Sequence, residues 1–164
     1  MPKAAWATGS QRAGSRAGAS VSCRHHQPER PCPGIPCAMH FTKIILYTAA
    51  DGRAGFREES LPLTEGKPAA RLSPLMPSGG LQLRISPVGF RSDFHCTENP
   101  QWLFVLAGQM EIGLQDGRVR VFGPGQHFYS ADTLPSGATF DPRLHGHCSR
   151  QLGDEPLVTA FVRA

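Results

Sequence analysis

The sequence contains no run of about 20 apolar residues, the length that a helix needs to cross a bilayer, which excludes membrane-spanning helices. Charged residues make up only 18% of the chain. The 18 glycines and 15 prolines supply many turns and disfavour long helices. A length of 164 residues suits one domain, or one domain with a tail.

The formal net charge of +4 is unevenly distributed. Residues 1–38 hold five basic residues and one acidic residue, whereas the other 126 residues hold twelve of each kind. A protein that binds the phosphate backbone needs basic side chains gathered on the folded domain. The electroneutral body therefore predicts no nucleic-acid partner.

Residues 1–38 show neither helical nor strand periodicity, and Ala, Gly, Ser, Pro and Arg dominate them. Such a segment buries too little apolar surface to offset its ordering entropy, so we predict a disordered leader before a domain at 39–164. Three explanations of the leader remain open. Translation begins at Met39, or the leader is an Arg- and Ser-rich transit peptide, or, least well supported, it is a secretory signal that lacks an apolar region.

Three of the five cysteines, Cys23, Cys32 and Cys37, lie in this leader near histidines. They form no C-x-x-C pair, so their spacing does not fit a structural zinc site. The body contains only Cys96 and Cys148. Because the sequence also shows no apolar secretory region, this small number favours a reducing compartment, and we predict a cytoplasmic protein.

The body alternates apolar and polar residues in short runs that end in turn residues. Asp116-Gly117 is a strong hairpin signal because both residues tolerate positive φ. The predicted strands are 41–47, 81–85, 101–106, 109–114, 118–122, 126–130 and 157–162. Closely spaced strands without a credible helix predict an all-β sandwich or barrel.

One segment has a specific spacing of glycines and polar residues. Five residues separate Gly89 from His95, and one separates His95 from Thr97. Three residues separate Thr97 from Gln101, and six separate Gln101 from Gly108. This spacing resembles the first motif of the cupin superfamily. At two ligand positions the sequence departs from that motif, with Thr97 in place of a second histidine and Gln101 in place of glutamate.

A second segment resembles the other cupin motif. The interval from Pro142 to His147 is that of the motif, although Leu144 replaces its glycine. Small single-domain cupins often end in an Asp-Thr…Gly-His sequence, and Asp132-Thr133 with Gly146-His147 is similar to it. The two motifs together extend the resemblance over about residues 80–162.

The resemblance implies a cupin-type double-stranded β-helix, that is, a jelly-roll barrel, and a homodimer. It also implies a divalent metal ion held by His95, Gln101 and His147, with Thr97 and His145 as further pocket residues. Inward side chains of a barrel converge on one cavity, so residues distant in sequence can share an ion. Imidazoles bind Fe, Zn, Ni or Mn without distinguishing among them, and an amide oxygen is a weaker ligand. We therefore expect lower metal affinity than in a cupin with three histidines and a glutamate.

The resemblance implies a protein that binds a small molecule, with a metal-dependent enzyme as the leading interpretation. Two other functions remain open beside it. The protein is a metal-dependent enzyme of oxygenase or isomerase type, a non-catalytic binding or sensor module without metal, or a structural subunit with a collapsed cavity.

Neighbouring polar residues have simpler explanations. His127 follows a turn, which predicts a surface or rim position. Asp93 and Glu98 flank His95 as acid–base groups, as replacement ligands or as solvated loop charges. Cys96 and Cys148 adjoin proposed ligands and should face the opposite side of their strands.

Overall fold

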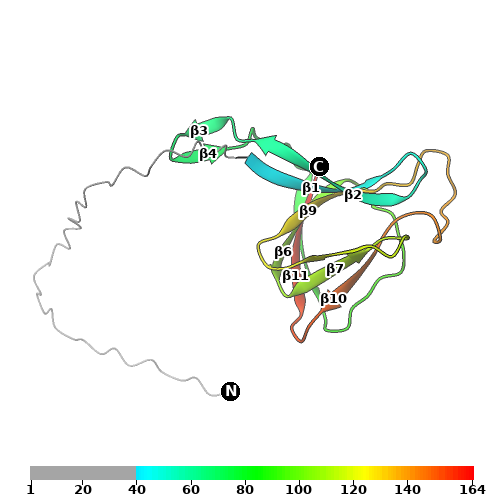
Figure 1. The fold of residues 1–164 in the computed structure, drawn as a ribbon. Helices are drawn as coiled ribbons and strands as arrows, with labels where there is room; N and C mark the ends of the chain where they lie inside the picture. The colour runs from blue at the N-terminus through cyan, green and yellow to red at the C-terminus, as the bar shows by residue number, and fades with distance from the viewer. Residues whose placement is uncertain (1–39) are drawn as a thin grey trace, which may run out of the picture. The chain divides into compact units, whose positions relative to one another are not determined.

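The computed structural model describes residues 40–164, and the predicted leader at 1–38 lies outside the described residues. The described residues form strands and no helix (Figure 1). The strands are β1 (His40–Thr48), β2 (Ala54–Pro62), β3 (Glu65–Lys67), β4 (Ala70–Leu72), β5 (Gly80–Ser86), β6 (Gln101–Ala107), β7 (Gln109–Gly113), β8 (Val119–Phe122), β9 (His127–Ala131), β10 (Cys148–Leu152) and β11 (Leu157–Arg163). No helix that could cross a membrane occurs within residues 40–164.

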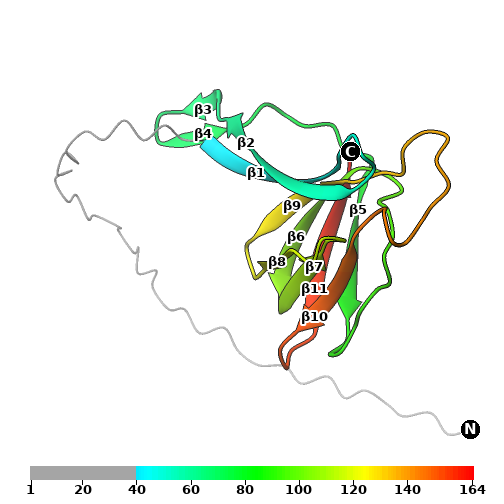
Figure 2. The ribbon, with the colours of Figure 1, turned by 45° about the vertical axis from the view of Figure 1, so that its right-hand side comes forward.

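Two sheets face each other across the domain (Figure 2). The larger sheet has the order β2-β1-β9-β6-β11-β5, and the smaller has the order β10-β7-β8. The short β3–β4 hairpin forms a separate two-stranded sheet. Within the large sheet only the β1–β9 contact is parallel; β1 therefore extends an otherwise antiparallel sheet.

The antiparallel pairs are nested along the chain. β7 pairs with β8, β6 with β9, and β5 with β11. Between the β6–β9 pair and the β5–β11 pair, two isolated bridges join the segment 91–95 to β10 and to the residue just before it. These bridges link Arg91 to Arg150 and His95 to His147. This nesting is a jelly-roll arrangement, and it confirms the predicted all-β fold class.

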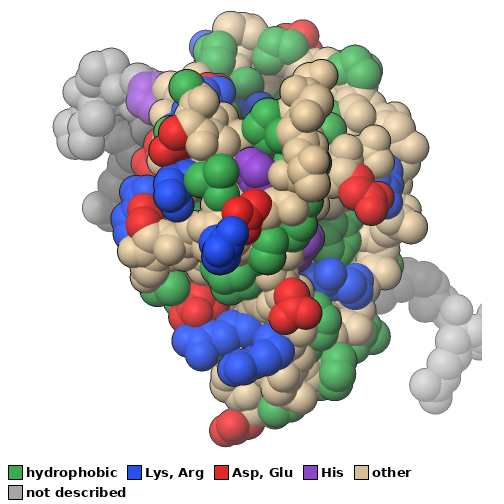
Figure 3. Space-filling model, turned by 90° about the vertical axis from the view of Figure 1, so that its right-hand side faces the viewer, with side chains coloured by type: hydrophobic (Ala, Val, Ile, Leu, Met, Phe, Trp, Pro, Cys, Tyr) green, Lys and Arg blue, Asp and Glu red, His purple; other side chains and the backbone are tan. Residues whose placement is uncertain are grey.

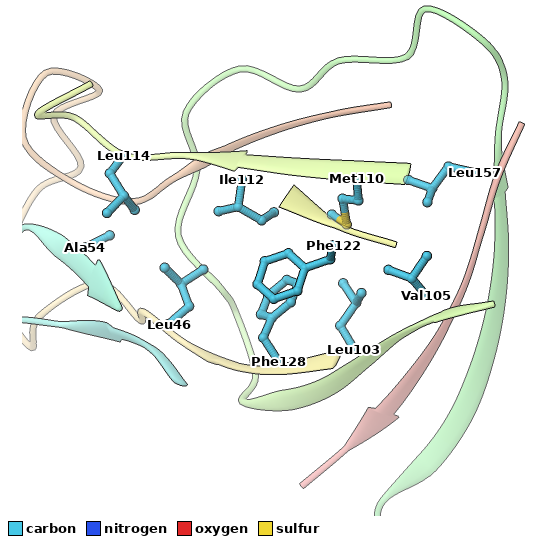
Figure 4. Close-up of a cluster of buried hydrophobic side chains, with 10 residues drawn as sticks. All are labelled: Leu46, Ala54, Leu103, Val105, Met110, Ile112, Leu114, Phe122, Phe128 and Leu157. Atoms are coloured by element: carbon cyan, nitrogen blue, oxygen red, sulfur yellow. The ribbon is translucent and has the colours of Figure 1, made fainter. Parts of the chain in front are cut away.

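The apolar core fills the space between the sheets (Figure 4). β6 and β9 contribute Leu103, Val105 and Phe128 from one side, while β7 and β8 contribute Ile112 and Phe122 from the other. The remaining buried members are Leu46, Ala54, Met110, Leu114 and Leu157. Three members of this core, Leu103, Met110 and Phe128, also line the cavity that contains His95 and His147.

All seven predicted strands are present, and no end differs from its prediction by more than one residue. Four strands were not predicted: β2, β3, β4 and β10. On the face that Figure 3 shows, basic and acidic side chains are interspersed, in keeping with the balanced charge of residues 39–164.

Candidate functional site

His95 and His147 lie side by side although 51 residues separate them in the chain. The His95 N–H donates to the His147 carbonyl at 2.9 Å, and the His147 N–H donates back at 3.0 Å. The ring centroids are 4.5 Å apart. Gly146 makes this approach feasible because a Cβ at its position would collide with the His95 carbonyl, and its φ is +76°.

A buried carboxylate organises the side chains behind the two rings. Asp132 is fully buried, and its Oδ2 lies 2.6 Å from His147 Nδ1. Its Oδ1 accepts from the hydroxyls of Thr97 at 2.5 Å and Ser130 at 3.3 Å. The two hydroxyl oxygens are themselves 2.6 Å apart. Asp132 therefore fixes the position of His147 and uses the Thr97 hydroxyl hydrogen within the wall of the site.

The two imidazoles share a tautomer pattern. His95 Nδ1 lies 2.9 Å from the Asp93 carbonyl oxygen, and His147 Nδ1 faces the Asp132 carboxylate. Because both partners accept hydrogen bonds, each neutral ring carries its hydrogen on Nδ1 and keeps a lone pair on Nε2. No hydrogen bond to either Nε2 is formed within residues 40–164. Each ring thus retains one nitrogen donor for an ion or a ligand.

Both histidines line a cavity of about 280 Å³, together with Gln101 and Thr97. His95 is exposed and His147 is buried, so the two rings extend from the mouth to the wall. Leu103, Met110 and Phe128 supply apolar surface. The other lining residues are Arg84, Cys96, Glu98, Asn99, Ser130, Ser149, Phe161 and Arg163. Four of the five predicted pocket residues therefore surround one cavity.

His145 lies elsewhere and does not line this cavity. It is buried beside Gly52, and its Nδ1 accepts a hydrogen bond from the Asp141 N–H at 3.0 Å. His145 was expected among the pocket residues, and in a continuous strand it would share a face with His147, two residues later. Parity fails here because His145 precedes β10 and the left-handed Gly146 interrupts the strand alternation.

The donor set fits a weak metal site. Imidazole nitrogens and the Gln101 amide oxygen are groups that can ligate a divalent ion, but none of them is anionic. The Asp132–His147 contact is the outer-shell arrangement that orients metal-binding histidines. Among residues 40–164 no three or more His, Cys, Asp and Glu side chains form a metal-binding group.

The neighbouring polar residues occupy the cavity rim or other surfaces. His127 stacks on Phe41, with centroids 4.3 Å apart, and its Nε2 lies 3.1 Å from the Thr42 carbonyl. Cys96 contributes to the cavity wall, contrary to the expectation that it faces away. Burial, and secondarily the charge of Asp132, raises the pKa of the Cys96 thiol, which disfavours a reactive thiolate.

The sequence analysis named Asp132 only as part of a motif, without a role in the site, and it assigned no role to Arg84 or Arg163. Ser130 and Asp132 continue the inward face of Phe128 at a spacing of two residues, and this signal could have identified Asp132. Arg84 occupies an inward position of β5, between outward Leu83 and Ile85. Its proximity to Arg163 depends on strand register, which local sequence does not reveal.

No protein-family model matches the chain, and no curated protein matches its sequence. Two solved structures are similar to parts of it. A protein of unknown function from Rhizobium leguminosarum bv. viciae 3841 is 17% identical with a TM-score of 0.38, covering 51% of this chain and 66% of its own, just under two thirds. The Schizosaccharomyces pombe Cnp3 cupin domain is 13% identical with a TM-score of 0.41, covering 76% of this chain and 83% of its own. These similarities concern architecture alone, and the jelly-roll assignment comes from the strand pairing described above.

Proposed function

We propose that the cavity binds a small molecule together with a divalent metal ion held by His95, Gln101 and His147. The observation that carries this proposal is the pair of imidazoles whose Nδ1 atoms are held by oxygen acceptors. Such pairing orients each ring and leaves Nε2 as the donor atom. Fe, Zn, Ni and Mn all accept this combination of ligands.

A bound metal would supply Lewis-acid or oxygen-activating chemistry, as in enzymes of isomerase or oxygenase type. The protein's own residues perform the positioning. Asp132 holds His147, while Thr97 and Ser130 satisfy the second Asp132 oxygen. Leu103, Met110 and Phe128 offer the apolar part of a ligand a surface from which water is excluded.

A second candidate is a non-catalytic binding or sensor module that uses the same cavity without metal. The engagement of both Asp132 oxygens favours it, because the lining then supplies no free carboxylate beyond the exposed Glu98. A site without an anionic ligand holds a dication less tightly.

Metal analysis of full-length protein purified without chelator, before and after reconstitution, separates the two candidates. We expect about one metal ion per chain in wild type, and loss of it in His95→Ala and His147→Ala. His127→Ala is the matched control, because His127 lies outside the cavity. Wild type that holds no metal after reconstitution supports the second candidate, and equal retention in all three variants contradicts the ligand assignment.

We also propose that the protein forms a homodimer through β5, an edge strand that exposes large apolar side chains. The predicted cytoplasmic location stays a prediction.

A further inference from the structure

Two arginines face the same cavity as the histidines. Arg84 comes from β5 and Arg163 from the end of β11, two strands that pair with each other. The β11–β6 register places Arg163 directly opposite Gln101, one of the proposed metal ligands. Both arginines also line an adjoining hollow of about 350 Å³ with Gln82 and Phe161. Two cationic side chains therefore line the same cavity as the proposed metal ligands.

Neither arginine forms an ion pair with a carboxylate of residues 40–164. Arg163 Nη2 donates to the neutral Gln82 amide oxygen at 2.8 Å. Arg84 Nε is buried and has no hydrogen-bond partner within the described part of the chain. The hydroxyl oxygen of Thr159 is the other buried side-chain atom without a hydrogen-bond partner in the described part of the chain. Thr159 lies directly across from Arg84 in the β5–β11 register, yet the two side chains form no hydrogen bond with each other.

Aromatic contacts orient the Arg84 side chain. Its Cζ lies 4.8 Å from the Phe161 ring centroid and 5.3 Å from that of Phe90. Rings stacked against a guanidinium cover its faces and leave its in-plane N–H groups as donors. Burial lowers the pKa of the Arg84 guanidinium, the direction expected for a cation withdrawn from water without an anionic partner.

We propose that Arg84 and Arg163 bind the carboxylate group of a small organic acid whose carbon chain occupies the cavity. This inference rests on the proposed small-molecule function and names its ligand class. A guanidinium matches the planar geometry of a carboxylate, and its bond to an anion is stronger than one to a neutral group. Leu103, Met110 and Phe128 fit the apolar chain, and a cavity of about 280 Å³ suits only a small ligand.

The charges around the cavity agree with this assignment. Glu98 is the one acidic side chain in the lining and is exposed at the rim. With neutral imidazoles, the two arginines leave the lining with a net positive charge. An acid bound there would place its carboxylate between the arginines and its far end toward His95 and His147.

The test is an NMR titration of full-length, chelator-treated protein with butanoate, with its neutral isostere butanamide and with inorganic phosphate. We expect butanoate to shift resonances of cavity residues, and butanamide and phosphate to bind at least about tenfold more weakly. Arg84→Gln should raise the butanoate Kd by about tenfold or more. Arg118→Gln, which changes an exposed arginine paired with Asp116, should leave it unchanged.

Equal binding of butanoate and butanamide would overturn the proposal, as would phosphate binding as tight as that of butanoate. An absence of butanoate binding would do the same. The comparison of the three probes uses wild type, so it remains decisive if Arg84→Gln does not fold; Arg163→Gln then serves as the second variant. Because the protein is metal-free, butanoate binding supports this inference even if metal analysis contradicts the proposed metal site. Metal retention without butanoate binding overturns this inference alone.

Discussion

Asp132 links the polar side chains of the cavity to one another. Its two oxygens accept hydrogen bonds from three side chains that come from three separate segments of the chain. A buried carboxylate is retained only when hydrogen bonds compensate for the loss of its hydration. Asp132 is accordingly a positioning residue for His147 and Thr97.

Asp132→Asn tests this role with almost no change in side-chain volume. Whichever way the amide turns, at least one of the three donors loses an acceptor, and the charge that polarises His147 is removed. We expect a loss of about 1–3 kcal/mol in the free energy of unfolding, measured by urea denaturation. If the metal proposal holds, Zn²⁺ affinity should also fall about 10–100-fold in a chelator competition assay.

Asp93→Asn is the matched control for Asp132→Asn. Asp93 is exposed and contacts His95 through its backbone carbonyl, which the substitution leaves in place. This variant should retain wild-type stability and metal affinity. An Asp132→Asn protein as stable as Asp93→Asn would show that the buried network contributes little.

At the scale of the strand and the turn, the site depends on how closely segment 91–95 approaches β10. Gly146 sits at that crossing with a left-handed backbone and with no room for a Cβ against the His95 carbonyl. Gly146→Ala should lower the free energy of unfolding by more than the about 1–3 kcal/mol that left-handed strain alone costs, because the paired His95 and His147 backbones must separate. Thermal or urea denaturation measures the loss.

Gly153→Ala provides the comparison for Gly146→Ala. Gly153 has a similar φ of +80°, but nothing lies within 4 Å of the Cβ position. The difference between the two variants therefore isolates the collision from the backbone strain. Equal destabilisation would mean that the close approach of the two segments is not tightly constrained.

The elements also show which parts of the fold can be predicted from sequence. β5 and β8 alternate in hydropathy and end in turn residues, so their periodicity was sufficient. β2 escaped prediction because it is an edge strand whose exposed part carries the charged run Arg57–Glu58–Glu59. β10 was missed because its buried side chains include the polar Ser149 and Gln151. The Ser149 hydroxyl pairs with that of Ser92, and the Gln151 amide oxygen accepts from the Gly89 N–H.

Some residues of the candidate site could likewise be predicted from sequence, and others could not. Motif spacing singled out His95, Gln101 and His147, and all three line one cavity. The family resemblance supplied the long-range pairing of His95 with His147, which local periodicity does not contain. Arg84 and Arg163 come from strands that are distant in sequence. That both line one cavity depends on the β5–β11 register, and register emerges only from the complete set of strand pairings.

At the scale of the whole molecule, β5 is an edge strand that exposes large apolar side chains, which is unfavourable for a monomer in water. Leu81, Leu83 and Ile85 are 63%, 68% and 72% exposed, and they share the face of the strand opposite to Arg84. β5 also ends the six-stranded sheet, so its outer backbone groups pair with no strand of residues 40–164. Exposed apolar edges of this kind favour pairing with a second copy.

A two-fold dimer through β5 would bury the same apolar side chains of both copies. We expect size-exclusion chromatography with light scattering to give twice the chain mass. Leu83→Lys should raise the dimer Kd by at least about tenfold, because it removes apolar contact and places two like charges at the interface. Val119→Lys makes the same change on β8, an edge of the smaller sheet, where Val119 is 57% exposed. A monomeric wild type, or equal dissociation by both variants, would rule out β5 as the contact, because only the β5 substitution should separate the two copies.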